Sequence, residues 1–275
     1  MNQKIAIQGI RGSFHHAVAM DYFTPSIDLL ECLSFDALAE AIISGEVNQA
    51  VMALENSIAG SIIPNYALID QNDLSIVGEY NLNIHHQLMC LPGQKISDIT
   101  SVQSHPMALL QCKEYFKSYP HIKLIEANDT ADVARSIALD KRMGVAAIAP
   151  KAAAEIYGLT ILASSIQTIK DNVTRFVVLQ KKPTSSEPKQ INKASLKFIL
   201  DHQRGSLATV LNVMSDCLLN LTKIQSLPVI ETPGKYAFFV DITFEKFDHY
   251  AKARKILEIM TLEFKTLGEY SDAKR

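Results

Sequence analysis

The sequence predicts an α/β protein in which an open, largely parallel α/β region is followed by a ferredoxin-like βαββαβ module. Up to residue 182, short apolar strands alternate with amphipathic helices. Residues 183–192 are polar, contain two prolines and show no apolar period, which is typical of a linker. After them, apolar residues recur at strand and helix spacing in the order βαββαβ.

The first strands and helices follow from residue patterns. Residues 5–8 and 49–54 are apolar runs of strand length. Ser34 is a typical N-cap residue and Gly45 a typical helix end. The apolar stripe between them consists of Phe35, Leu38, Ala39, Ile42 and Ile43. Further helices are expected to begin at Pro106, near Thr130 and near Pro150.

The C-terminal module is predicted from six short segments and one turn. In order, these are a strand at 196–200, a helix over 207–218, a strand around Ile224, a turn at Pro233 and Gly234, a strand at 238–244, a helix over 253–260 and a strand at 265–271. No catalytic group of residues occurs in them. From the residues alone, this module packs or dimerises.

Composition and charge exclude several classes of protein. The chain is 48% hydrophobic and 20% charged, with a formal net charge of -2, so it has globular composition and lacks the basic charge of a nucleic-acid-binding protein. No apolar run reaches the length of a membrane span, and the first residues do not resemble a signal peptide. We therefore expect a cytoplasmic protein without nucleic-acid or membrane partners.

Cysteines and histidines do not predict a metal site. The four cysteines share no CxxC spacing, which favours free thiols in a reducing cytosol; they are Cys32, Cys90, Cys112 and Cys217. Two pairs of histidines are neighbours in the sequence, and neighbouring side chains point apart on a helix or strand. No HExxH spacing occurs.

Polar loops follow the predicted strands, where open α/β sheets bind ligands. Residues 9–14 follow the first strand and form either a tight turn or part of a site. Residues 55–61 follow the second and suit an anion or a hydroxyl group, although an ordinary polar turn is the alternative.

Three later segments could also bind a carboxylate. Ser104 and His105 precede Pro106, and residues 128–130 lie at another predicted helix start. Helix N-termini offer free N–H groups to anions, although plain capping explains these residues equally well. Arg175 adjoins an apolar strand. Its guanidinium either clamps a carboxylate through two hydrogen bonds or forms a surface ion pair.

Four strings, in this order, resemble the prephenate dehydratase family over nearly the whole chain. They read Leu54-Glu55-Asn56-Ser57, Ser104-His105-Pro106-Met107-Ala108-Leu109, Ala146-Ala147-Ile148-Ala149 and Asn172-Val173-Thr174-Arg175-Phe176. The C-terminal module resembles an ACT domain, and Gly205-Ser206-Leu207-Ala208 is similar to its first ligand motif. The usual family residues are replaced at Ile10, His15, Met107 and Pro150.

The resemblance implies conversion of prephenate to phenylpyruvate, water and carbon dioxide in phenylalanine biosynthesis. Aromatisation drives this reaction, so we expect neither a metal nor a cofactor. The catalytic region would cover residues 1–182 and resemble type II periplasmic-binding proteins, with one lobe at about 1–79 and 159–182 and the other at about 80–158. Residues 183–192 would be the linker and 193–275 the ACT domain.

The same resemblance implies roles for single residues. Thr174 would hydrogen-bond the departing hydroxyl, Arg175 would bind the carboxylate of the pyruvyl side chain, and Phe176 would pack against the ring. The expected substrate-binding residues are Glu55, Asn56, Ser57, Gly60, Ser61, Ser104, His105, Thr130 and Asn172. Glu55 and His105 are the titratable candidates for a proton donor.

The ACT resemblance implies L-phenylalanine as effector and a homodimer or homotetramer. The expected effector-binding residues are Gly205, Ser206, Leu207, Ala208, Gln225, Ser226, Leu227 and Pro228. Gln225 and Leu227 replace an acidic and a basic residue of the usual second motif. These neutral residues either loosen that loop or pack and preserve it.

Two other functions remain open. An arogenate dehydratase would use the same site on an aminated side chain. A two-lobed amino-acid sensor would bind without turnover. The residues Thr174 and Phe176 on either side of Arg175 favour an enzyme, because a pure binder needs only the arginine.

Overall fold

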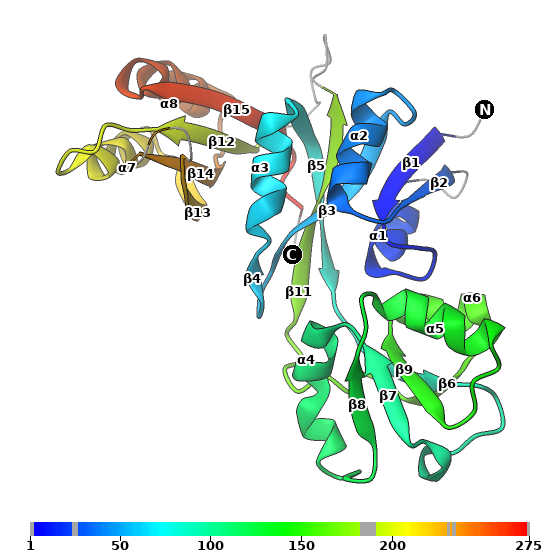
Figure 1. The fold of residues 1–275 in the computed structure, drawn as a ribbon. Helices are drawn as coiled ribbons and strands as arrows, with labels where there is room; N and C mark the ends of the chain where they lie inside the picture. The colour runs from blue at the N-terminus through cyan, green and yellow to red at the C-terminus, as the bar shows by residue number, and fades with distance from the viewer. Residues whose placement is uncertain (1–2, 24–26, 182–190, 230–231, 233–234, 274–275) are drawn as a thin grey trace. The chain divides into compact units, whose positions relative to one another are not determined.

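A computed structural model of the chain describes residues 3–23, 27–181, 191–229, 232 and 235–273 (Figure 1). It is a mixed α/β structure whose described residues fall into two compact units. The first unit combines Met1–Ile62 with Tyr80–Phe176, and the second combines Ile63–Glu79 with Val177–Arg275. Strands β5 and β11 therefore have residues in both units.

One sheet of the first unit is largely parallel, as predicted. Strand β1 pairs in parallel with both β2 and β3. The first residues of β11 lie beside β3. The short strand β4 also pairs with β3, in the antiparallel direction. The strands are β1 (Gln3–Gln8), β2 (Ile27–Cys32), β3 (Gln49–Asn56), β4 (Gly60–Ser61) and β11 (Val173–Lys181). Helices α1 (Phe14–Tyr22) and α2 (Phe35–Ile43) connect them. Their apolar faces bury Val18, Ala19, Leu38 and Ile42.

The other sheet of the first unit has five strands in the order β10-β6-β9-β7-β8. Strand β7 is parallel to β8 and β9, whereas β6 pairs antiparallel with β9 and β10. The strands are β6 (Gln87–Cys90), β7 (Ser101–Ser104), β8 (Lys123–Glu126), β9 (Val145–Ala149) and β10 (Thr160–Ala163). The helices are the 3-10 helix η1 (Ile96–Asp98), α4 (Pro106–Phe116), α5 (Thr130–Leu139) and α6 (Lys151–Tyr157). Two sheets in this unit fit a two-lobed arrangement.

Helix starts in the first unit lie where the residue patterns place them. Ser34 caps α2, and its Oγ accepts a hydrogen bond from the N–H of Ala37 at 3.1 Å. Helix α4 begins at Pro106, α5 begins at Thr130 and Pro150 is the N-cap of α6. Gly45, just beyond α2, has φ +79, the left-handed conformation that favours glycine.

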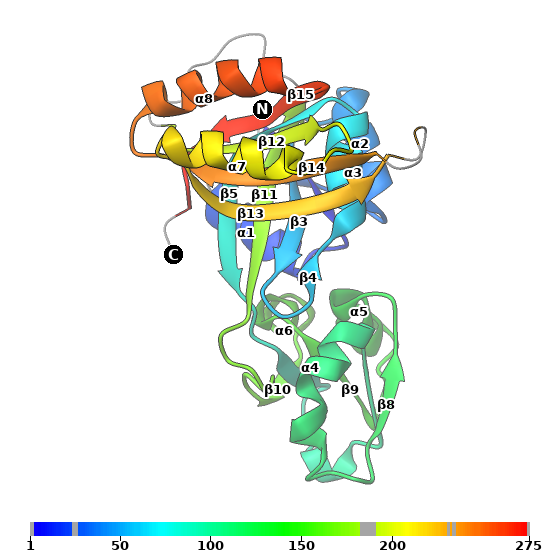
Figure 2. The same cartoon turned by 90° about the vertical axis from the view of Figure 1, so that its left-hand side faces the viewer.

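The C-terminal part of the second unit has the predicted βαββαβ order (Figure 2). Helices α7 and α8 lie over the antiparallel sheet β13-β14-β12-β15, with Leu196, Phe198, Val210 and Tyr250 in the core between them. The elements are β12 (Lys193–Ile199), α7 (Ser206–Asp216), β13 (Asn220–Pro228), β14 (Tyr236–Thr243), α8 (Phe247–Met260) and β15 (Glu263–Tyr270). The expected turn at Pro233 and Gly234 and most of the linker at 183–192 lie outside the described residues.

Helix α3 (Ile63–Gln71) and the start of β5 (Leu74–Asn83) group with this C-terminal sheet rather than with the first unit. Asp70 pairs with Lys197 at 2.7 Å and with Lys265 at 3.1 Å, which holds α3. Strand β15 approaches β5 so closely that a Cβ on Gly268 would lie 2.2 Å from the carbonyl oxygen of Ile76. The expected domain boundaries instead place residues 63–79 in the catalytic region. These boundaries stay a prediction.

No described helix is long and apolar enough to cross a membrane. No group of three or more metal-binding side chains is found in the described part of the chain. The cysteines are free and buried, and burial raises the pKa of Cys112 to about 12.

Candidate functional site

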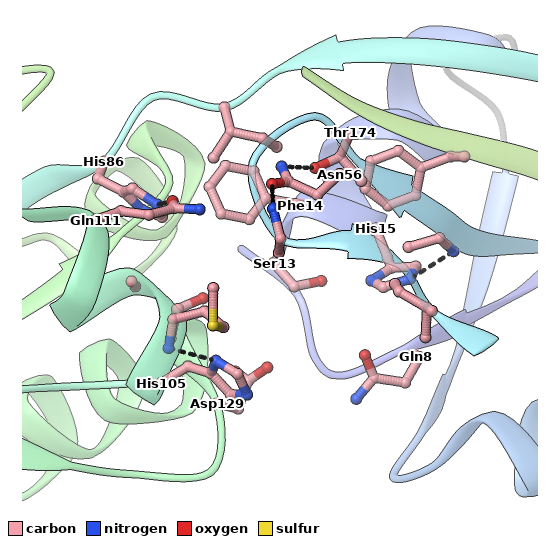
Figure 3. A pocket seen from close by; sticks show the side chains of 18 of the residues that line it. Gln8, Ser13, Phe14, His15, Asn56, His86, His105, Gln111, Asp129 and Thr174 are labelled. Carbon is pink, nitrogen blue, oxygen red and sulfur yellow. Dashed lines mark hydrogen bonds between the residues drawn. The ribbon is translucent and has the colours of Figure 1, made fainter. Parts of the chain in front are cut away.

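The first unit contains a cavity of about 350 Å³ (Figure 3). This volume lies in the range of small-molecule sites, about 300–1,000 Å³. Most of its lining is apolar or aromatic, with a few amide, hydroxyl and imidazole groups. The lining residues are Gln8, Ser13, Phe14, His15, Phe35, Ala53, Asn56, Ala59, Ile62, Ile84, His86, His105, Met107, Ala108, Gln111, Asn128, Asp129, Thr130, Thr174 and Phe176.

Helices α1, α4 and α5 begin at this pocket. Their N-caps are Ser13, His105 and Asp129, each of which accepts a backbone N–H from the first turn of its own helix. The remaining N–H groups of a first turn have no partner within the helix, and the helix dipole favours negative charge there. Three such N-termini around one cavity suit an anionic ligand, in particular a carboxylate.

The pocket attracts anions without a cationic clamp. Among the lining residues that the structure describes there is no lysine or arginine, and Asp129 is the formally charged one. His15 and His86 are buried, which lowers the pKa of both, that of His15 to about 3. Both imidazoles are therefore neutral near pH 7, and the attraction for an anion comes from backbone dipoles.

A chain of hydrogen bonds orients the Thr174 hydroxyl. Asn56 Nδ2 donates to Thr174 Oγ1 at 2.9 Å and to Asn172 Oδ1 at 2.6 Å. Asn56 Oδ1 accepts the N–H groups of Ile58 and Ala59 at 3.0 and 2.9 Å, so the amide cannot turn over without losing these bonds. Because Thr174 Oγ1 already accepts from Asn56, the hydroxyl proton is the one available to a ligand.

The same network continues to Gln111 and His86. Asn172 Nδ2 donates to Gln111 Oε1 at 3.0 Å, and the Nε2 of His86 lies 2.9 Å from that oxygen. A carbonyl oxygen can only accept, so Nε2 of His86 carries the proton. Figure 3 shows the Gln111 amide between His86 and the pocket. Its nitrogen can therefore donate to a ligand.

His15 has the opposite tautomer. The N–H of Ala53 donates to its Nε2 at 3.2 Å, which leaves the proton on Nδ1. The imidazole contacts Phe176 edge to face, with ring centroids 5.0 Å apart. His15 thus fixes the orientation of Phe176 and lines the pocket as a neutral group.

Five of the predicted site residues line the pocket, and they are Asn56, His105, Thr130, Thr174 and Phe176. Asn172 lies behind them, fully buried, and holds Asn56 and Gln111. Ser57 holds the start of β11 through its Oγ, which accepts the Val173 N–H at 2.9 Å. This bond fixes the residue next to Thr174, and a contact of Ser57 with the substrate stays a prediction.

Besides Ser57 and Asn172, four predicted substrate-binding residues are not among the lining residues. Ser104 is buried, and its hydroxyl donates to the carbonyl of Ile148 at 2.7 Å. Glu55 pairs with Ser61 in the short β3–β4 hairpin, in which Gly60 has φ +84. Of the two predicted titratable groups, Glu55 and His105, the histidine lines the pocket.

Arg175 lies between two lining residues but does not line the pocket. Thr174 and Phe176 face the cavity, and successive side chains of a strand point to opposite faces. Arg175 is 9% exposed, so it is not the surface ion pair considered from the sequence. Its binding of the substrate carboxylate stays a prediction.

Several lining residues were not predicted. Gln8 is the last residue of β1, and Ser13 and Phe14 end the glycine-containing loop 9–14, which was the signal for them. Gln111 lies two residues beyond one of the four family-like strings, yet it was given no role. No sequence pattern marks four further lining residues, because only packing brings them to the pocket. They are His15, His86, Ile62 and Ile84.

The second unit contains a smaller cavity, of about 250 Å³. Its lining residues are Leu200, Asp201, His202, Gln203, Ser206, Leu207, Tyr236 and Phe238. Two predicted effector residues, Ser206 and Leu207, are therefore present at the start of α7, whose N-cap Gly205 has φ +85. Gly205, Ala208 and the four residues Gln225, Ser226, Leu227 and Pro228 are not in the lining.

Comparison with known proteins identifies the family. The model of the family "Prephenate dehydratase" matches residues 5–184. Arogenate dehydratase/prephenate dehydratase 2, chloroplastic, of Arabidopsis thaliana is 36% identical over 97% of this chain and 72% of its own length. The bifunctional chorismate mutase/prephenate dehydratase of Enterobacter agglomerans is 31% identical over 97% of this chain and 70% of its own. The chain spans 57% of arogenate dehydratase 2 of Petunia hybrida, at 40% identity.

Three solved structures share the fold. The prephenate dehydratase of Arthrobacter aurescens in complex with L-Phe has a TM-score of 0.89 at 25% identity and covers 98% of this chain and 90% of its own. The prephenate dehydratase of Staphylococcus aureus has a TM-score of 0.84 at 26% identity, and the match covers 98% of this chain and 100% of that chain. GqqA, described as a novel type of quorum quenching acylase, has a TM-score of 0.89 at 26% identity, with 99% and 98% covered. The family model matches residues 5–184, and two relatives more than 30% identical match 97% of the chain. This chain therefore belongs to the prephenate dehydratase family.

Proposed function

We propose that this chain catalyses the decarboxylating dehydration of prephenate to phenylpyruvate in phenylalanine biosynthesis. The Thr174 hydroxyl carries the proposal, because Asn56 holds it with its proton free to face a ligand in the pocket. In the reaction, the bond between the ring and its hydroxyl breaks while the ring carboxylate leaves as carbon dioxide. The electron pair of the broken carbon–carbon bond completes the aromatic ring, and the departing oxygen takes up one proton to become water.

Thr174 stabilises the leaving hydroxyl. A threonine is too weak an acid to donate a full proton unaided, so its hydrogen bond polarises the oxygen as negative charge develops. The bond is strongest when that charge is largest, which lowers the barrier rather than tightening substrate binding. Gln111 offers a second neutral donor from the same network.

The absence of a cationic side chain from the lining suits decarboxylation. A guanidinium against the ring carboxylate would stabilise the starting charge and oppose its loss as carbon dioxide. A helix N-terminus attracts an anion less strongly than a guanidinium does, because it carries only about half an elementary positive charge. Phe14, Phe176 and Ile84 supply an apolar surface on which the product ring can pack.

The alternative reactions are less well supported by the pocket. Hydrolysis of an amide, as the name of GqqA suggests for that protein, needs an activated nucleophile. Within the described residues, the pocket hydroxyls of Ser13, Thr130 and Thr174 form no hydrogen bond to a histidine ring. A sensor without turnover would not need the held hydroxyl of Thr174.

We also propose that residues 1–182 are the catalytic domain, 183–192 the linker and 193–275 an ACT domain that binds L-phenylalanine. The βαββαβ order supports the domain, and the Arthrobacter aurescens structure contains L-Phe. In the second pocket, the start of α7 can hold the carboxylate, Asp201 the ammonium and Phe238 the ring. The exposed edge strand β13 would join copies in a homodimer or homotetramer.

A single assay tests the proposed activity. Purified chain with prephenate and no added metal or nucleotide should form phenylpyruvate, read by its absorbance in alkali, and a chelator should not stop it. The mechanism requires no cofactor. Turnover of neither prephenate nor arogenate would contradict the proposal in favour of a sensor. The chloroplastic location belongs to the plant relatives; for this chain we propose the cytoplasm.

A further inference from the structure

We propose that Asp129 is a specificity-determining residue that binds the ammonium group of an aminated substrate, so that the site accepts arogenate and prefers it to prephenate. This inference rests on the proposed function and concerns the same pocket. The two substrates differ at one carbon of the side chain, which carries an ammonium in arogenate and a keto oxygen in prephenate. The residue that faces this carbon therefore decides between them.

The position of Asp129 follows from the position of Thr174. The departing hydroxyl lies at one end of the substrate ring, and the ring carboxylate and the side chain share the carbon at the other end. Figure 3 shows Thr174 and Asn56 on one side of the pocket and Asp129 beside His105 on the opposite side. With the hydroxyl at Thr174, the side chain of the substrate reaches the start of α5.

Asp129 has one carboxylate oxygen engaged and one available. Its Oδ1 accepts the N–H of Asp132 at 2.8 Å and caps α5. Its Oδ2 makes no hydrogen bond within the described residues. A Cβ placed on Gly9 would lie 3.3 Å from Oδ2 and 3.6 Å from Ser13 Oγ. Oδ2 and the Ser13 hydroxyl therefore face the same small space, which the glycine leaves open.

This space suits the two charges of an α-amino acid. The N–H groups of Thr130 and Ala131 are the first two of α5 and need an acceptor, which a side-chain carboxylate provides. The ammonium on the neighbouring carbon would meet Asp129 Oδ2 and the lone pairs of Ser13 Oγ. A charge-assisted hydrogen bond of this kind is about twice as strong as a neutral one.

Prephenate gains nothing from Asp129. Its keto oxygen is an acceptor, and an acceptor facing a carboxylate oxygen is repelled. No lysine or arginine in the lining offsets that repulsion. The single negative side chain of the pocket thus favours the substrate that brings a positive charge.

The test is the ratio of kcat/KM for arogenate to kcat/KM for prephenate in the wild type and in Asp129→Asn. Asparagine keeps an oxygen for the helix cap but has no charge. We expect the ratio to exceed one in the wild type and to fall about tenfold in the variant. Asp129→Ser, which also caps, should cause the same fall. Asp132→Asn is the matched control on the same helix, since Asp132 is exposed and pairs with Arg135.

The outcomes separate this inference from the proposed function. An unchanged ratio in active Asp129→Asn and Asp129→Ser enzymes overturns the role of Asp129 and leaves the dehydratase intact. A wild type that turns over prephenate but not arogenate also overturns it. Turnover of neither substrate contradicts the proposed function and this inference together. Thermal unfolding of each variant shows that the helix cap has survived.

Discussion

The two pockets of this chain are built from similar parts but differ in one respect. Each places a helix start, an aspartate and aromatic side chains around a small cavity, with Asp129 and Phe176 in one and Asp201 and Phe238 in the other. In the described part of the chain, only the first pocket has an amide network that holds a hydroxyl toward the cavity. The shared parts suit recognition of a charged aromatic molecule, and the network adds the means to transform it.

Removing the held hydroxyl should have the largest effect. We expect Thr174→Ala to lower kcat for prephenate about a hundredfold or more, with little change in KM, because the lost hydrogen bond matters chiefly in the transition state. Steady-state formation of phenylpyruvate measures it. Thr174→Ser, which keeps the hydroxyl, should retain kcat within about tenfold. A near-normal kcat in the alanine variant would remove Thr174 from the mechanism.

Turning the hydroxyl without removing it should have a smaller effect. In Asn56→Asp, the new oxygen cannot donate to Thr174 Oγ1, so the hydroxyl proton turns toward Asp and away from the substrate. We expect kcat to fall about thirtyfold. This loss is smaller than the loss expected when a donor that contacts the developing negative charge is removed.

The matched control for this substitution is Asn72→Asp, since Asn72 donates to the carbonyl of Leu68 at 2.9 Å in the second unit. It should leave kcat unchanged. Equal losses in the two variants would show that charge in general, and not the Thr174 contact, is responsible.

The second pocket should respond in binding and not in turnover. We expect Asp201→Asn to weaken the binding of L-phenylalanine about tenfold, because a charge-assisted hydrogen bond to the ammonium is lost, while kcat without phenylalanine stays the same. Calorimetry measures the affinity. Asp216→Asn, at the exposed end of α7, is the control. Loss of basal activity in Asp201→Asn would mean that the two pockets are not separate in function.

The histidines of the two pockets should differ in their effect on stability. His15 is buried, and its pKa is lowered to about 3. Between pH 6.5 and 3, this histidine therefore binds a proton in the unfolded chain but not in the folded chain. Its contribution to stability is complete above pH 6.5 and is lost as the pH falls. From pH 6.5 to 5.5 we expect a loss of about 1 kcal/mol.

His15→Gln should abolish that part of the pH dependence of urea unfolding, since glutamine does not titrate. His202→Gln, in the second pocket, is the control because His202 is exposed and its removal takes away no buried neutral imidazole. A pH dependence unchanged by His15→Gln would contradict the burial argument.

Local patterns predicted the elements of both units well. Ser34, Pro106 and Pro150 mark helix starts because capping and proline geometry depend on neighbouring residues alone. The βαββαβ order of the C-terminal part follows from apolar period in the same way. The grouping of α3 with the C-terminal sheet was not predictable, because it depends on pairs such as Asp70 with Lys197, which are distant in the sequence.

The sequence by itself determined the family and pointed to Thr174 as the candidate catalytic residue, since the string around Thr174 and the fixed order of the other strings are local features. Only the tertiary structure decided which side chains face the ligand. Strand alternation directs Thr174 and Phe176 to the pocket and Arg175 away from it. His15 and Asp129 join them because three helices begin at one cavity, and that convergence depends on contacts between distant segments.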